Sequence, residues 1–157
     1  MELTLYTTIS WLVATYLITT IQKKEVIRSI IIYFIFTIIT VSIFTIISLN
    51  LQLIYVTKEK TKFISLLINR NIIMPFLILI FINWYYRLTS YTKIIPIILL
   101  LSIMTLLELI NLKLQIYSYV NWNFGLTFLI NAFFVLATLI ISKGINVIEL
   151  KSEGNGA

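Results

Sequence analysis

The sequence predicts an all-α integral membrane protein, a bundle of about five transmembrane helices. Hydrophobic residues make up 60% of the 157 positions and charged residues only 11%, whereas a soluble domain carries about 25% charged residues. The mean hydropathy is +1.02. A water-soluble chain of this size could not bury so much apolar surface in one core, so the expected solvent is a lipid bilayer.

Five apolar stretches follow one another along the chain, and each is a candidate transmembrane helix. A hydrocarbon core of about 30 Å requires about 20 apolar residues per helix. The stretches cover residues 3–21, 29–49, 72–86, 94–112 and 120–142. They place residues 1–150 in a single transmembrane domain, and the polar segment 151–157 is predicted to be a short disordered tail.

The first stretch is predicted to be a membrane helix and not a cleaved signal peptide. Glu2 stands where a signal peptide carries basic residues, and no small-x-small cleavage site follows. Positive charge comes after the stretch, which favours an N-terminus outside and a cytoplasmic C-terminus. The inside then holds seven Lys and Arg residues and the outside five: 23, 24, 28, 87, 93, 143 and 151 against 58, 60, 62, 70 and 113.

The region between the second and third stretches allows two interpretations. The second stretch has a semi-polar extension from Gln52 to Val56, and the third is short and contains Pro75. In the segment 57–71, polar residues recur at spacings of four, three and four: Lys58, Lys62, Ser65 and Asn69. This pattern suits an amphipathic helix on the membrane surface, which would leave four spans plus an interfacial or re-entrant segment. Alternatively, Phe63 onward lengthens the third span.

Aromatic residues mark the ends of the later stretches. The run Trp84-Tyr85-Tyr86 ends the third stretch, while Tyr117, Tyr119 and Trp122 precede the fifth. Amphipathic rings prefer the headgroup level of a bilayer, so we interpret these residues as aromatic belts at the membrane surface.

Hydrogen-bonding residues inside three stretches are spaced to share a face or a drifting row of a helix. The first carries Thr4, Thr8, Trp11, Thr15 and Thr19; the fourth carries Ser102, Thr105, Glu108, Asn111 and Gln115; the fifth carries Asn123, Thr127, Asn131, Thr138 and Ser142. A polar face in hydrocarbon should point at neighbouring helices or at a wet cavity. These residues are therefore either helix–helix contacts or the lining of a pathway or binding cleft.

Glu108 is the one acidic residue inside an apolar stretch, and Arg70 is its predicted partner. Arg70 precedes the third stretch and Glu108 lies near the end of the fourth, so antiparallel neighbours bring both to the same side of the membrane. A guanidinium offers a planar fork that suits a carboxylate. Two other roles remain open for Glu108: a protonatable site for protons or small cations, and a contact for a basic residue of a partner subunit.

The composition argues against enzymatic chemistry. The chain has no His, Cys or Asp, which excludes disulfides, His or Cys metal sites and Ser-His-Asp or Cys-His catalytic arrangements. We expect no catalytic residue, no metal and no cofactor. The net charge of +6 is expected to flank membrane helices and not to bind nucleic acid, because the basic residues lie between the apolar stretches.

Short motifs in the last 85 or so residues resemble a known family. Met74-Pro75, the run Asn83 to Tyr86, Glu108 and the run Tyr119 to Trp122 follow one another in order. This order resembles an uncharacterised family of small multi-pass membrane proteins of spore-forming Gram-positive bacteria (bacilli and clostridia). The resemblance implies a plasma-membrane location and marks Pro75, Glu108 and Trp122 as family features, but it implies no activity.

The sequence therefore predicts a non-enzymatic function, as a structural or accessory subunit of a membrane assembly. Its expected partners are the lipid bilayer and either other membrane subunits or further copies of itself. The alternative is a small oligomeric carrier or channel for protons or cations that uses Glu108.

Overall fold

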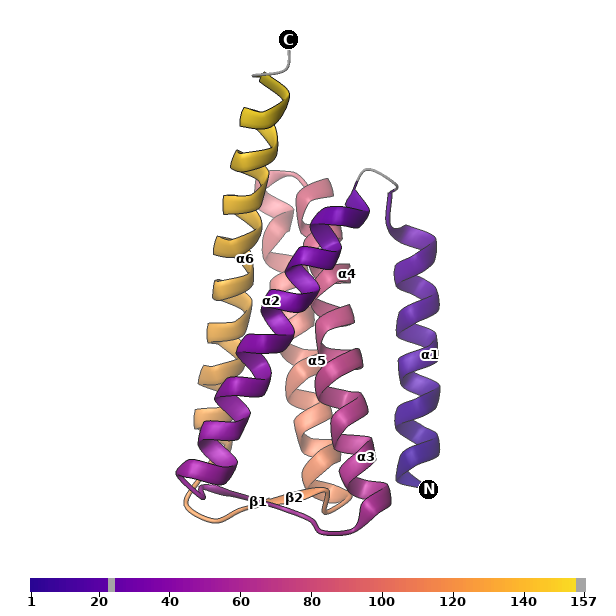
Figure 1. Cartoon of the computed structure of the whole chain (residues 1–157), viewed down its shortest axis with the longest axis vertical. Coiled ribbons are helices and arrows are strands. Elements are labelled where there is room, and N and C mark those ends of the chain that lie inside the picture. Colours follow the sequence, from indigo (N-terminus) through magenta and orange to yellow (C-terminus); the bar gives the residue numbers. More distant parts are fainter. Residues whose placement is uncertain (23–24, 155–157) are drawn as a thin grey trace.

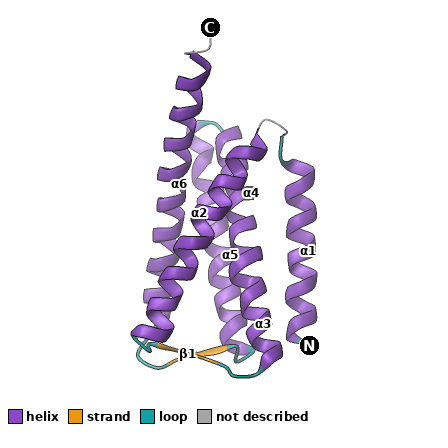
Figure 2. Cartoon of the chain, in the orientation of Figure 1, coloured by secondary structure: helices purple, strands orange, loops and turns teal. Residues whose placement is uncertain are grey.

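The computed structural model describes residues 1–22 and 25–154 of the chain. Within these ranges, five helices are long and apolar enough to cross a membrane: Glu2–Thr20, Val26–Asn50, Lys60–Arg87, Tyr91–Lys113 and Phe124–Ile145. Helix dominates the chain, as Figure 2 shows, so the predicted all-α class is confirmed.

The elements in chain order are α1 (Glu2–Thr20), α2 (Val26–Thr45), the π-helical turn η2 (Ile46–Asn50), β1 (Ile54–Val56), α3 (Lys60–Ile68), the π-helical turn η3 (Asn69–Ile73), α4 (Met74–Arg87), the 3-10 turn η4 (Ser90–Lys93), α5 (Ile94–Lys113), β2 (Tyr117–Tyr119) and α6 (Phe124–Gly154). Helix α1 stands at one side of the bundle, and α2 crosses the front obliquely (Figure 1). The N-terminus lies at the end of the bundle that carries β1 and β2, and α6 runs to the other end.

The main core lies where α2, α4, α5 and α6 meet. Its best-buried apolar side chains come from all four of these helices, with Phe36, Ile78, Met104 and Val135 as one example from each. Large apolar side chains also cover the outside of the bundle, as expected of a chain whose solvent is hydrocarbon.

The third span is longer than the sequence pattern suggested. Helical structure runs without interruption through α3, η3 and α4, from Lys60 to Arg87. From Lys60 onward, the segment 57–71 is therefore continuous with the third helix and is not a separate one, as the interpretation in which Phe63 onward lengthens the third stretch predicts. The physical reason is packing, because Ser65 and Leu66 are buried and α3 lies against α1.

Pro75 explains the π-helical turn at the middle of this helix. Proline has no N–H, so it cannot donate to the carbonyl four residues earlier. That carbonyl belongs to Asn71, and it accepts a hydrogen bond of 2.8 Å from the hydroxyl of Tyr33 on α2. The carbonyl that the proline leaves without a donor is thereby satisfied from a neighbouring helix. The same hydrogen bond fixes α2 against η3.

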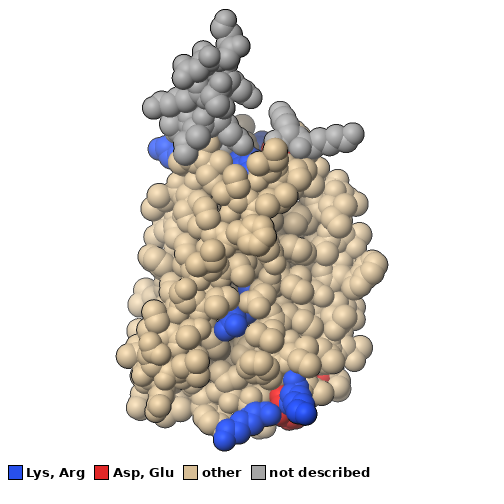
Figure 3. Space-filling view, viewed as in Figure 1, with Lys and Arg blue, Asp and Glu red and all other residues tan. Residues whose placement is uncertain are grey.

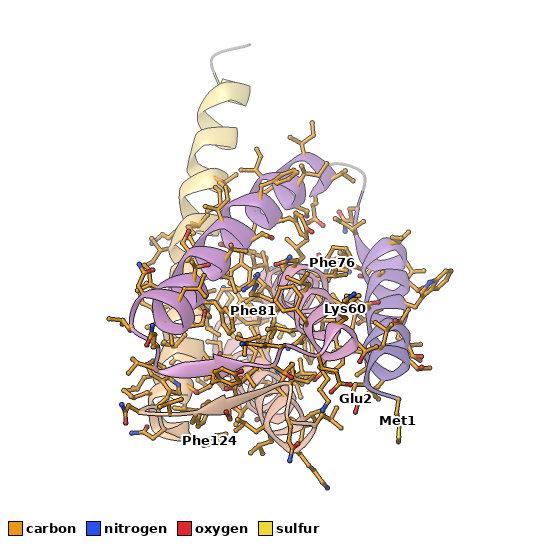
Figure 4. All side chains as sticks on the ribbon, turned by 60° about the horizontal axis from the view of Figure 1, so that its bottom comes forward. Met1, Glu2, Lys60, Phe76, Phe81 and Phe124 are labelled. Carbon is orange, nitrogen blue, oxygen red and sulfur yellow. The ribbon has the colours of Figure 1, made fainter. Side chains whose placement is uncertain are left out.

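The extension after the second span is a strand and not more helix. Residues Ile54–Val56 form β1, which pairs antiparallel with β2, and Ile54 lies opposite Tyr119. Figure 4 shows this short ribbon lying across the end of the bundle, in front of the helix ends. The ribbon ties the connection between the second and third spans to the connection between the fourth and fifth.

The C-terminal segment differs from the predicted disordered tail. Helix α6 continues through Gly154, so residues 151–154 are helical. The remainder of the predicted tail, 155–157, lies outside the described residues.

We predict that Tyr33→Phe lowers the free energy of unfolding in detergent by about 1 kcal/mol, because the Asn71 carbonyl loses its donor. The loss should shrink in a Pro75→Ala background, where the restored N–H can bond the same carbonyl. Tyr16→Phe, which alters an exposed tyrosine of α1, is the matched control. An equal loss in both backgrounds would contradict the role assigned to Tyr33.

Candidate functional site

The carboxylate of Glu108 is held by three hydroxyl groups. Glu108 lies on α5 and is only 9% exposed. The hydroxyl of Tyr117 donates to its Oε2 atom, and the hydroxyl of Tyr119 donates to its Oε1 atom. The hydroxyl of Thr127 lies 3.4 Å from the same Oε1 atom. Both oxygens of this buried acid are therefore satisfied by neutral donors.

The two tyrosines reach Glu108 because of how α5 ends. The N–H of Ile116 bonds to the carbonyl of Asn111 and the N–H of Gln115 bonds to the carbonyl of Leu112, which is the Schellman arrangement. It requires a left-handed residue, and Gln115 adopts φ 53°. The chain then reverses into β2, where alternation places Tyr117 and Tyr119 on one face of the strand.

The hydrogen-bond network extends from Glu108 into α6. Thr127 lies at the start of that helix, and its hydroxyl is 2.8 Å from the hydroxyl of Tyr119 and accepts a bond of 2.8 Å from the indole N–H of Trp122. The network therefore joins α5, β2 and α6 at one end of the bundle.

A second buried bond fixes α1 next to this network. The hydroxyl of Tyr6, which is fully buried, donates to Oδ1 of Asn111 at 2.6 Å. Asn111 lies three residues after Glu108 on α5, so both side chains lie on the same side of that helix. The first helix is thereby attached where Glu108 is buried.

Burial keeps the two tyrosines of β2 in their protonated form. Loss of hydration raises the pKa of Tyr117 well above its ordinary value, and the nearby charge of Glu108 raises it further. Burial and the hydrogen bond to Glu108 likewise raise the pKa of Tyr119. Both groups therefore remain hydrogen-bond donors across the physiological pH range.

A cavity of about 100 Å³ lies beside the Glu108 network. Its polar lining includes Glu108 and Asn111 from α5, Thr127 and Asn131 from α6, and Arg70 from η3. Aromatic and aliphatic side chains of all the helices from α2 to α6 and of η2, β1 and β2 form much of the remaining wall. Concave sites of this kind, apolar with a few convergent polar groups, are where proteins bind small ligands.

The predicted ion pair between Arg70 and Glu108 is not formed. Ion pairs among the described residues join Glu2 to the N-terminus, Glu25 to Arg28 and Glu59 to Lys62. The guanidinium of Arg70 instead stacks over the ring of Phe44, with 4.9 Å from Cζ to the ring centroid, and its Nε donates to Oδ1 of Asn71 at 3.3 Å. Arg70 and Glu108 line the same cavity without forming an ion pair, because hydroxyl groups occupy the oxygens of Glu108 and only the Nε atom and the plane of the Arg70 guanidinium have partners.

The remaining predicted site residues divide into two groups. Asn111, Thr127 and Asn131 are buried and line the cavity. Ser102 is exposed and its hydroxyl bonds to the Ile98 carbonyl of its own helix, while the hydroxyl of Thr105 is buried without a partner among the described residues and lies outside the cavity lining. The predicted inward face of the fifth span is confirmed from Thr127 to Ser142, and Asn123 at its start is exposed.

The row of hydrogen-bonding residues predicted on α1, here called the α1 stripe, points outward from the bundle. Its five residues are all exposed: Thr4, Thr8, Trp11, Thr15 and Thr19. The expectation that this stripe meets neighbouring helices of the chain or a cavity inside it is wrong. The buried residues of α1 are Tyr6 and Leu17, which lie on its other side.

The sequence reasoning missed the tyrosine donors. Tyr117 and Tyr119 were interpreted as a membrane-surface belt, whereas both bind Glu108. A signal was present, because two tyrosines at alternate positions shortly after a helix end can turn back together onto the last turns of that helix. Asn69 was likewise missed as a cavity residue.

No family model matches the chain, and neither a curated protein nor a solved structure matches it. The resemblance to small membrane proteins of spore-forming bacteria therefore stays a prediction. Among the side chains that the structure describes, no group of three or more acidic, His or Cys residues is placed to hold a metal ion.

We predict that Glu108→Gln and Tyr117→Phe show a coupling of about 0.5–3 kcal/mol in a double-mutant cycle of unfolding in detergent, because the two groups are in direct contact. The effects of Glu108→Gln and Arg70→Gln should be additive within about 0.5 kcal/mol, because these two side chains are not in direct contact. A strong coupling of the second pair and none of the first would reverse the assignment.

Proposed function

We propose that this chain is a multi-pass integral membrane protein with a non-enzymatic role, as a structural or accessory subunit that binds a transmembrane helix of another subunit. Five helices long and apolar enough to cross a bilayer support the membrane location. The lack of His, Cys and Asp supports a non-enzymatic role, since one carboxylate held by hydroxyls is a poor acid–base constellation.

The observation that carries the proposal is the outer face of α1, with Trp11 at its centre. Trp11 is 73% exposed and lies nine residues after Glu2, so about 14 Å along the helix at a rise of about 1.5 Å per residue. That distance places the ring near the middle of a bilayer, whereas tryptophan prefers the headgroup level. Its indole N–H has no acceptor within the described part of the chain, and a partner helix would supply one.

The surroundings of Trp11 fit a helix. Side chains of α1 and Ile72 of η3 form a shallow groove beside the indole, and the α1 side includes Ser10, Ala14 and Thr15. Small side chains allow close approach of helices in a membrane, and hydroxyls can bond across the interface. The exposed hydroxyl of Thr15 has no partner among the described residues, in contrast to Thr8, which bonds to the Thr4 carbonyl at 2.9 Å.

The positive-inside rule supports an N-terminus outside and a C-terminus inside a bacterial plasma membrane. The longer third helix places Arg70 ten residues from its start, whereas Lys60 and Lys62 stay in its first turn at the end of the bundle. When Arg70 is left out of the count, four basic positions remain on the outer side (58, 60, 62 and 113) against seven on the inner side. The wider margin favours the predicted orientation.

We predict that a photo-crosslinking amino acid at Leu12, beside Trp11, captures one discrete membrane protein in the native host. The matched control is Ile140 on α6, which is 73% exposed where Leu12 is 66% exposed, and it should capture lipid only. Trp11→Leu should reduce the crosslink from position 12 and co-purification of the partner. A species of twice the chain's mass would identify the partner as a second copy, and lipid adducts alone at both positions would contradict the proposal.

The second candidate function is a proton or small-cation carrier. The observation that favours it is that Glu108, a buried acid, lines a cavity inside the bundle. This function predicts pH-dependent flux in liposomes that disappears in Glu108→Gln, with Glu59→Gln, an exposed acid at the end of the bundle, as the control. Flux no greater than that of empty liposomes, across pH and cation conditions, would exclude it.

A further inference from the structure

The guanidinium of Arg70 is a charge held far from the ends of its helix. Arg70 follows Lys60 by ten residues, or about 15 Å at a rise of about 1.5 Å per residue. Figure 3 shows a basic group at mid-height on the face crossed by α2, surrounded by uncharged surface. An arginine at such a depth is costly in hydrocarbon and is expected to have an anionic or polar partner.

The chain supplies only part of that partner. Phe44 stacks on the guanidinium and Asn71 accepts from Nε. Within the described residues, no carboxylate oxygen lies within 4.0 Å of the guanidinium, and its two terminal nitrogens have no hydrogen-bond acceptor. Those nitrogens are the fork that binds carboxylates and phosphates.

Two further amides line the same cavity without partners. Asn69, next to Arg70 on η3, is 4% exposed, and its Oδ1 atom is buried without a hydrogen bond. Asn131 on α6 is 6% exposed, and its amide has no hydrogen bond within the described chain. Buried amides normally find partners. A rotation about the last side-chain bond presents the NH₂ group of either residue as a donor.

The rest of the cavity suits an apolar chain. Its walls carry Phe36, Ile43, Met74, Ile130 and Phe134, and the rings of Phe36 and Phe134 pack edge to face with 5.6 Å between their centroids. The space of about 100 Å³ holds a head group and only a few methylene groups. A longer chain would therefore leave the cavity sideways, past the half-buried Arg70 and into the surrounding bilayer.

We propose that this cavity binds an anionic single-chain amphiphile from the bilayer, a carboxylate or phosphate head group on an acyl chain. The terminal nitrogens of Arg70 bind the head group, the amides of Asn69 and Asn131 donate to it, and the apolar wall holds the first methylene groups. The oxygens of Glu108 bond to the hydroxyls of Tyr117, Tyr119 and Thr127 and form no ion pair with Arg70, so the guanidinium is left for the head group.

The same groups argue against the other ligand classes. A cation would meet the uncompensated Arg70 and find the oxygens of Glu108 already bonded. A neutral sterol or alcohol would leave the guanidinium without a counter-charge, which is the larger cost in a low-dielectric site. A small free anion would leave the apolar wall unfilled.

The test is a titration of the full chain in a neutral detergent, with thermal stability as the readout. The probes are oleate and oleoyl lysophosphatidate; oleyl alcohol supplies the chain without charge, and acetate and inorganic phosphate supply the charge without a chain. We expect saturable stabilisation by the two acidic amphiphiles and none by the three controls. Arg70→Gln should weaken the apparent Kd by at least about tenfold, and Arg87→Gln, an arginine bonded to Thr20 at the far end of the bundle, should leave it unchanged.

Each other outcome overturns the proposal. Equal stabilisation by oleyl alcohol would mean a site for any chain, and stabilisation by acetate or phosphate would mean a small-anion site. An unchanged apparent Kd in Arg70→Gln would remove the guanidinium from the site. If Arg70→Gln does not fold, Asn131→Leu tests the same head-group contacts, and an unchanged apparent Kd there has the same meaning.

Discussion

The burial of the Glu108 carboxylate is the constraint on which one end of the bundle depends. A buried acid without donors would cost several kcal/mol, and its donors come from Tyr117 and Tyr119, which lie beyond the end of its own helix. The chain must therefore reverse sharply after α5, which it does through the left-handed Gln115. The strand that carries the tyrosines is held in place by β1. The loop between the second and third spans is fixed by the same requirement.

The two charges that line the cavity are stabilised separately, and the energetics explain why. A direct pair would gain Coulomb energy only after both ions had lost their hydration, and one such pair often contributes little net stability. Neutral hydroxyls satisfy Glu108, while a ring and an amide partly satisfy Arg70. The result is a cavity that both charged groups line without pairing.

Sequence reasoning predicted the elements that depend on hydropathy and on helix geometry. The five apolar stretches became helices, and the inward face of α6 followed from a spacing of three and four residues. The antiparallel argument brought Arg70 and Glu108 to the same side of the bundle, and both line one cavity there, although the predicted ion pair is not formed. It could not reveal the donors of Glu108, because tyrosines near a span end look the same whether they face headgroups or turn back onto a helix. A three-residue strand is likewise too short to leave a pattern.

The outward stripe of α1 shows a further limit of periodicity, which identifies a face but not its direction. The hydrogen bonds that attach α1 to the bundle lie near its two ends. Tyr6 bonds to Asn111 at one end, and the Thr20 carbonyl accepts from Asn83 and Arg87 at the other. None of the stripe residues is required for these contacts, so the fold does not explain a tryptophan and four threonines on one exposed face. The hydrogen bonds that attach α1 to the bundle make no use of this face, and the face carries the indole ring of Trp11 halfway along the helix. A contact outside the chain explains such a face better than lipid alone does.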